Sequence, residues 1–195
     1  MNSTLRILFV LATTLTAFGQ GTVNFNNKVT ASGINAPVTD ATGAVLGRDY
    51  LAQLYAGATP DSLTPVGSAV VISLNHPPTG YFQGGTRQID FLSPIVGGWF
   101  QVRAWAARNG ASYVTAVASD GTVGFSNIFH LGILGDPNAP LETLPVDLVG
   151  LQPFSVHAVP EPGTLVLGFL GVAALTLRVQ RNKPRAGQLV RRLPA

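Results

Sequence analysis

The apolar residues between residues 20 and 158 occur in short strings rather than in long helical periods. Strings rich in Val, Ile, Phe, Tyr and Thr alternate with Gly, Pro, Asn and Asp, which is the pattern of short β-strands separated by turns. The pattern predicts eight strands: Thr22–Asn26, Tyr50–Ala56, Ala69–Leu74, Thr86–Leu92, Gly98–Arg108, Ala111–Ala118, Thr122–Leu131 and Gln152–His157. Strands of this length and spacing favour an all-β fold, an antiparallel β-sandwich of the jelly-roll or immunoglobulin-like kind.

Two dipeptides within this region have the composition of hairpin turns. Asn109-Gly110 fits a type I′ turn, in which both central residues need positive φ. Asp120-Gly121 repeats the signal eleven residues later. Together they predict a three-stranded meander over residues 98–131.

The string WFQVRAWA within this meander alternates with a period of two, so its side chains divide between the two faces of a strand. The face expected to point to the core holds Phe100, Val102, Ala104 and Ala106, and the other holds Trp99, Gln101, Arg103 and Trp105. The Arg103 guanidinium is within reach of the Trp105 indole. Such a face also suits stacking on sugar rings, which makes Trp99, Arg103 and Trp105 candidate glycan-binding residues. The alternative is that the tryptophans complete the core and Arg103 covers them.

Both ends of the chain carry apolar segments of a different kind. Residues 1–19 contain Arg6, an apolar stretch over 7–18 and the small pair Ala17 and Gly19. This order is typical of a secretory signal peptide cleaved between Gly19 and Gln20. The stretch is too short to span a membrane.

The C-terminal segment, residues 159–183, has three successive parts. Pro160, Glu161 and Pro162 form a rigid extended segment without backbone donors at the prolines. The apolar residues that follow predict a transmembrane helix over 163–179, just long enough to cross a bilayer. Arg178, Arg181 and Lys183 then supply positive charge for the cytoplasmic side. A basic tail, residues 184–195, completes the chain.

This order of Pro-Glu-Pro, apolar helix and basic cluster resembles the PEP-CTERM sorting signal of Gram-negative bacteria. The resemblance covers about 25 of the 195 residues. It implies recognition by exosortase, a membrane cysteine protease-transpeptidase, with Pro160, Glu161 and Pro162 as the processing motif. It also implies that Arg178, Arg181 and Lys183 act as stop-transfer charges. Chains with this signal usually end soon after the basic cluster, whereas this one continues through RAGQLVRRLPA.

The charge of the chain is concentrated in its tail. Residues 178–195 hold six basic residues and no acid, a charge of +6, and Arg6 adds +1. Residues 20–161 hold five basic residues against nine acids, a charge of −4, and the sum is the overall +3. The ectodomain therefore lacks the basic surface of a nucleic-acid-binding protein. Because the chain has no cysteine, disulfides and thiolate chemistry are excluded as well.

Residues suited to catalysis are sparse. The three histidines (His76, His130 and His157) are widely spaced, and no H-E-x-x-H motif is present. Asp49 and Asp90 are candidate carboxylates of a small hydrolase, although no second carboxylate is placed beside either one. We therefore expect no catalytic residue, bound metal or cofactor.

These patterns define four regions: a signal peptide (1–19), a β-sandwich ectodomain (20–158), the sorting signal (159–183) and the basic tail (184–195). We expect a non-catalytic, structural or adhesive protein that passes through the Sec translocon and is held by its C-terminal helix until exosortase acts. Its destination is the cell envelope, the cell surface or the extracellular matrix. A module that binds exopolysaccharide and a small secreted hydrolase are the alternatives.

Overall fold

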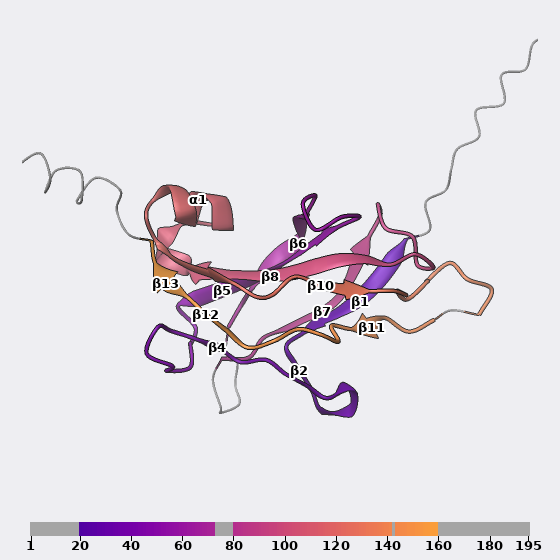
Figure 1. The fold of residues 1–195 in the computed structure, drawn as a ribbon, viewed down its shortest axis with the longest axis horizontal. Coiled ribbons are helices and arrows are strands. Elements are labelled where there is room, and N and C mark those ends of the chain that lie inside the picture. Colours follow the sequence, from indigo (N-terminus) through magenta and orange to yellow (C-terminus); the bar gives the residue numbers. More distant parts are fainter. Residues whose placement is uncertain (1–19, 73–79, 142, 160–195) are drawn as a thin grey trace, which may run out of the picture. The chain divides into compact units, whose positions relative to one another are not determined.

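The computed structural model describes residues 20–72, 80–141 and 143–159 (Figure 1). The chain divides into two compact units, residues 1–158 and 159–195. The described residues belong almost wholly to the first unit. The signal peptide, the Pro-Glu-Pro motif, the predicted helix over 163–179 and the basic cluster all lie outside them. Within the described ranges, no helix has the length and hydrophobicity needed to cross a membrane.

Strands dominate the first unit, which confirms the predicted all-β class. Apart from two 3-10 turns, the described residues contain a single helix. The elements in chain order are β1 (Gly21–Asn26), β2 (Lys28–Val29), η1 (Thr30–Ser32), β3 (Ile34–Asn35), β4 (Val38–Thr39), β5 (Tyr50–Gly57), β6 (Thr64–Val71), β7 (Gln83–Ile89), β8 (Gly98–Ala106), η2 (Ala107–Asn109), α1 (Tyr113–Ala118), β9 (Thr122–Phe125), β10 (Phe129–Leu131), β11 (Val146–Asp147), β12 (Phe154–Ser155) and β13 (His157–Ala158).

Two sheets contain most of these strands. The larger has the order β13-β9-β8-β5-β6, with β10 also paired to β8, and all its pairs are antiparallel. The smaller has the order β11-β1-β7, in which β1 is antiparallel to β7 but parallel to β11. A further parallel pair joins β4 to β12. The expectation that every pair would be antiparallel is therefore wrong for these two pairs.

The central strand of the larger sheet follows its predicted alternation. Phe100, Val102 and Ala104 are fully buried and Ala106 is nearly so. Phe100, Val102 and Ala104 join one hydrophobic core with side chains from both sheets, including Val23 of β1. Because the period of two matches the pleat of the strand, this face could be identified from the sequence.

The prediction of a strand over Ala111–Ala118 is wrong. The chain leaves η2 at Asn109, and Tyr113–Ala118 form the helix α1. Ser112 caps the helix by accepting the Thr115 backbone N–H at 3.2 Å, while the Thr115 hydroxyl accepts the Ser112 N–H at 3.1 Å. This capping box stabilises a helix start. Gly110 precedes it at φ 132°, a conformation that glycine tolerates best.

The predicted hairpins at Asn109-Gly110 and Asp120-Gly121 are also wrong. Asn109 ends η2 instead of occupying a type I′ turn. Asp120 and Gly121 terminate α1, with Gly121 donating to the Ala116 carbonyl at 2.9 Å. The three-stranded meander is therefore replaced by β8, a short helix, and β9 returning along β8.

Other strand boundaries differ from those predicted. The segment 122–131 is two strands, because Ser126 turns inward between β9 and β10 and its hydroxyl accepts the Val102 N–H at 2.9 Å. The β6 strand begins at Thr64 and includes Pro65. Proline lacks a backbone N–H, and this is tolerated because β6 is an edge strand. The β7 strand is displaced toward the N-terminus, and 152–157 becomes β12 and β13.

Candidate functional site

The helix α1 covers one end of the larger sheet and buries Trp105. This side chain is 0% exposed, its indole N–H donates to the Gly110 carbonyl at 2.9 Å, and its ring meets Tyr113 edge-on at 6.2 Å. A tryptophan enclosed in this way cannot stack on a sugar. The predicted glycan-binding plane of Trp99, Arg103 and Trp105 is therefore wrong for Trp105, because the helix α1, which the sequence did not predict, covers this side chain.

Arg103 lies beside this helix rather than on the Trp105 indole. Its guanidinium carbon is 4.0 Å from the centre of the Tyr55 ring and 5.2 Å from that of Tyr113. Its Nε donates to Gln101 Oε1 at 2.9 Å, and Gln101 in turn donates to the Ser126 carbonyl at 3.1 Å. Two aromatic faces and a fixed amide thus hold the guanidinium in one position.

A groove of about 350 Å³ opens over Arg103 on the outer face of the larger sheet. Three elements meet there: β8 supplies Gln101 and Arg103, α1 supplies Tyr113, and β9 supplies Phe125, which pairs with Arg103 across the strands. The remaining lining residues are Pro60, Leu63 and Ile128. Phe125 is 60% exposed, so a large aromatic surface faces solvent at the edge of this groove.

Trp99 lies on the same face of β8, one alternate position beyond Gln101. It is half-buried, and its ring packs against His130 of β10 with 5.0 Å between centroids. The position of Trp99 agrees with the predicted outer face. Exposed and half-exposed aromatic groups therefore follow this face from Phe125 to Trp99.

The tyrosines around Arg103 ionise with difficulty. Burial raises the pKa of Tyr55 above its ordinary value of 10.0, and the nearby charge of Arg103 partly offsets this. Burial also raises the pKa of Tyr113, again against the effect of Arg103. Because the folded chain holds these protons more tightly than the unfolded chain, the associated stability is complete below the unfolded pKa. It is lost as the pH rises through the folded pKa.

Replacing Arg103 by glutamine should raise both tyrosine pKa values further, because the charge that lowers them is removed. Tyrosinate absorbance during an alkaline titration measures this shift, and Tyr55→Phe identifies one of the late transitions by its loss. Arg108→Gln serves as the control, since Arg108 does not act on either ring. An unchanged titration in Arg103→Gln would contradict the arrangement.

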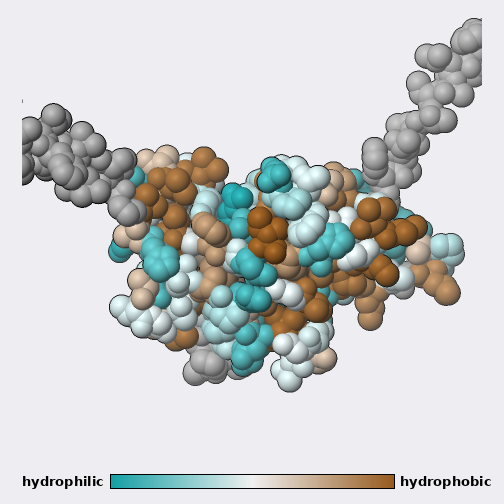
Figure 2. Space-filling view, in the orientation of Figure 1, coloured by the Kyte–Doolittle hydropathy of each residue, from teal (hydrophilic) through white to brown (hydrophobic). Residues whose placement is uncertain are grey.

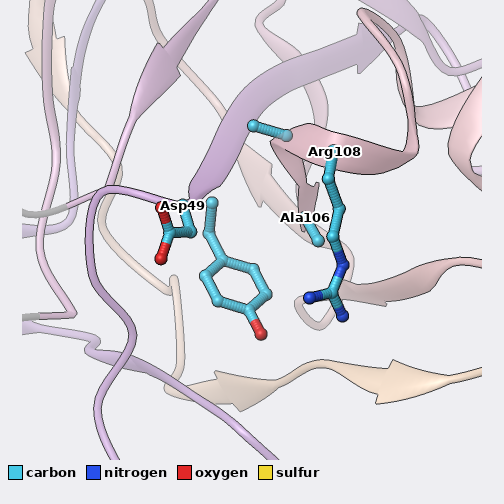
Figure 3. A pocket seen from close by; sticks show the side chains of 5 residues that line it. Asp49, Ala106 and Arg108 are labelled. Carbon is cyan, nitrogen blue, oxygen red and sulfur yellow. The ribbon is translucent and has the colours of Figure 1, made fainter.

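The candidate carboxylates of a hydrolase do not share a site. Asp49 lines a pocket of about 320 Å³ with Tyr50, Ala106, Ala107 and Arg108, and no other carboxylate of the described residues lies on its wall. Figure 3 shows Asp49 and Arg108 on different sides of this pocket. Asp90 lies elsewhere, just after β7, where its carboxylate accepts the Gln88 amide at 3.0 Å. The two-carboxylate geometry of a glycosidase is therefore not formed by this pair.

A third hollow, of about 350 Å³, is mostly apolar and lies between the loops that precede β8 and follow β10. Ile95, Ile133 and Leu144 line it and are 70–85% exposed. Figure 2 shows hydrophobic surface gathered at this end of the larger sheet. Contiguous apolar surface of this kind is typical of interaction sites.

Metal ligands do not converge in the part of the chain that the structure describes, where no three His, Asp, Glu or Cys side chains gather. The predicted sorting residues Pro160, Glu161, Pro162, Arg178, Arg181 and Lys183, and the predicted cleavage residue Gly19, lie outside the described ranges, whereas Gln20 is the first residue within them.

Comparison with known proteins identifies one segment of the chain. No curated protein and no solved structure matches the chain. Residues 158–182 match the family described as the PEP-CTERM protein-sorting motif. The match begins at the last residue of β13 and covers Pro160, Glu161, Pro162, Arg178 and Arg181. The chain thus carries a PEP-CTERM sorting motif at its C-terminal end, which implies an exported protein with a membrane-anchored precursor and exosortase as its processing partner.

Proposed function

We propose that this chain is a cell-surface or extracellular-matrix protein whose ectodomain has a structural or adhesive, non-catalytic role. The observation that carries the proposal is the sorting motif at residues 158–182, directly after the β-rich unit. The signal peptide delivers the chain to the Sec translocon, and cleavage follows Gly19. The helix over 163–179 holds the precursor in the membrane, and exosortase then passes the ectodomain to the envelope, surface or matrix.

We also propose that the ectodomain is a β-sandwich. Support comes from the single hydrophobic core, to which the smaller sheet contributes Phe25 and Ile89 and the larger contributes Leu54 and Phe100. A core shared by the inner faces of two sheets is the physical basis of sandwich folds. Such a rigid body, with binding surfaces on its outer faces, suits adhesion.

The sorting part of the proposal predicts a processing event that depends on Glu161. Intact-mass analysis and cell fractionation should be applied to the full chain expressed with and without an exosortase. The wild type should lose its C-terminal helix only when the enzyme is present. Glu161→Ala should retain it, because the acidic residue between the two prolines is removed. We expect processing to fall at least tenfold.

Glu142→Ala is the matched control, since Glu142 and Glu161 are the two glutamates of the chain. It should be processed like the wild type. A chain that keeps residues 162–195 in every host would contradict sorting and leave a plain membrane anchor. Equal processing of wild type and Glu161→Ala would show that exosortase does not recognise Glu161 of the Pro-Glu-Pro motif.

A further inference from the structure

We propose that the groove over Arg103 binds an acidic polysaccharide, with a uronate carboxylate on the Arg103 guanidinium and the sugar ring on Phe125. This goes beyond the proposed function, because it assigns a ligand class to a defined surface of the ectodomain. It also differs from the plane predicted from the sequence. Phe125 and Gln101 take the place of the buried Trp105.

The charge of the groove determines the charge of the ligand. Among the described residues, the contacts of Arg103 are with the neutral Gln101 amide and the neutral Tyr55 and Tyr113 rings, and none is with a carboxylate. Seven described residues line the groove, and none of these is acidic. A half-buried guanidinium that has lost part of its hydration without gaining a counter-ion favours an anion, and its planar donors suit a carboxylate.

The Arg103 side chain is already oriented for such a contact. Its Nε donates to Gln101 at 2.9 Å, and one of its faces lies on the Tyr55 ring at 4.0 Å, whose hydroxyl also interacts with the guanidinium. The terminal donors that do not face Tyr55 are those directed to a ligand. Gln101 is itself fixed by its bond to the Ser126 carbonyl. Since this arrangement exists before binding, little side-chain entropy is lost when the anion arrives.

The aromatic groups favour a sugar as the carrier of that anion. Phe125 is 60% exposed and directly opposite Arg103 on the neighbouring strand, so a ring stacked on it places a substituent within reach of the guanidinium. Sugar rings present apolar C–H faces together with polar edges, which fits a groove that combines Phe125 and Tyr113 with Arg103. The volume of about 350 Å³ lies at the small end of ligand pockets.

The continuation of the same face favours a polymer over a single sugar. Trp99, packed on His130, lies four residues from Arg103 along β8, which is ~13 Å at the rise of a strand. A linear polysaccharide that contacts Phe125 and Arg103 can therefore extend toward Trp99. The track begins at Phe125 and Arg103, passes Gln101 and ends at Trp99.

Titration calorimetry of the full-length chain in mild detergent tests this proposal, with oligoalginate as the uronate probe and dextran of equal length as the neutral probe. We expect oligoalginate to bind and dextran to bind at least tenfold more weakly. Arg103→Gln should weaken oligoalginate binding roughly 10- to 100-fold, the range for a charge-assisted hydrogen bond. Phe125→Ala should weaken it roughly tenfold through lost stacking.

Two controls match these variants. Arg108→Gln removes an exposed arginine at the other pocket, and Phe91→Ala removes a phenylalanine that is 48% exposed outside the groove. Both should bind oligoalginate like the wild type. Because Phe125 is a surface residue, its variant should also keep the thermal stability of the wild type, so that weaker binding is not a sign of unfolding.

Several results would overturn the proposal. These are no binding of oligoalginate, equal binding of dextran, or unchanged affinity in Arg103→Gln and Phe125→Ala. Binding of polyglutamate as tight as that of oligoalginate would assign the groove to acidic peptides instead. The assay needs no exosortase, so its outcome is independent of whether the sorting motif is processed.

Discussion

Replacing Asn27 by alanine is expected to lower the free energy of unfolding by roughly 2–6 kcal/mol, because the buried Ala36 carbonyl and Phe82 N–H lose their partner and the Gly80 carbonyl keeps only the Val38 N–H. Asn27 is 0% exposed. Its amide nitrogen donates to the carbonyls of Ala36 at 2.7 Å and Gly80 at 3.0 Å, and its amide oxygen accepts the Phe82 N–H at 2.7 Å. The side chain thus joins the region of residues 27–36 to Gly80 and Phe82, which lie 53 and 55 residues further along the chain.

Thermal unfolding of the full chain, followed by circular dichroism, measures this loss. A decrease in melting temperature of about 10–20 °C corresponds to it. Asn127→Ala is the matched control, because Asn127 also bonds through both amide atoms, to Gly150 and Gln152, but it is only half-buried and these bonds are exposed. It should cost about 1 kcal/mol or less. Equal effects of the two variants would show that burial of Asn27 does not matter.

Asn27→Asp keeps the shape of the side chain but removes its N–H donors, so it tests the donors alone. A carboxylate can still accept the Phe82 N–H, but it faces the Ala36 and Gly80 carbonyls as a repelling acceptor. Its pKa should therefore rise on folding, so the stability of this variant should increase as the pH falls and be lost as the pH rises through that pKa. A variant equally stable at acid and neutral pH would contradict this role.

The second large effect is expected at Gly97, where alanine should cost roughly 3 kcal/mol or more. Gly97 has φ +72°, and a Cβ there would lie 1.8 Å from the Leu131 carbonyl oxygen. Its own N–H donates to Ser93 at 2.9 Å. Because the obstacle is backbone, the loop before β8 and the end of β10 would both have to move.

Gly43→Ala is the control for backbone strain alone. Gly43 has φ +87°, but nothing lies within 4 Å of the position of its Cβ. We expect a loss of about 1 kcal/mol, the cost of positive φ for an ordinary residue. Urea denaturation of both variants measures the difference between them, which isolates the steric contact at Leu131. Similar midpoints would mean that the two loops separate easily.

The parts of the fold that the sequence predicted are those with a strong local period. The alternation of β8 correctly identified Phe100, Val102, Ala104 and Ala106 as buried, but Gln101 and Trp105 on the opposite face are buried as well, which the alternation did not indicate. The helix α1 has only six residues and buries only Ala116, so no helical periodicity exists to be recognised. Its one local signal is the pairing of Ser112 with Thr115, which resembles a capping box with threonine in place of glutamate.

The candidate groove could be predicted only in part, for a similar reason. Trp99, Gln101 and Arg103 share a face because of their spacing, and the sequence is sufficient to place them there. Phe125 joins them because β9 pairs directly with β8. The sequence did not predict this pairing, since it placed a strand where the helix α1 lies. The exclusion of Trp105 has the same origin, since the helix that buries it was expected to be a strand.

The pairing of β1 with β11 has a consequence for the order of events during export. Asn24 of β1 is bonded to Asp147 of β11 at 2.8 Å, a separation of 123 residues along the chain. Contacts of such long range slow folding, because a large loop must close before they form. A chain that emerges from its N-terminus can therefore pair β1 with β7 first, but Val23 and Asn24 gain their β11 partners, Val146 and Asp147, only after residue 147 has crossed. Completion of the smaller sheet thus waits for β11, which ends eleven residues before the sorting motif begins at residue 158.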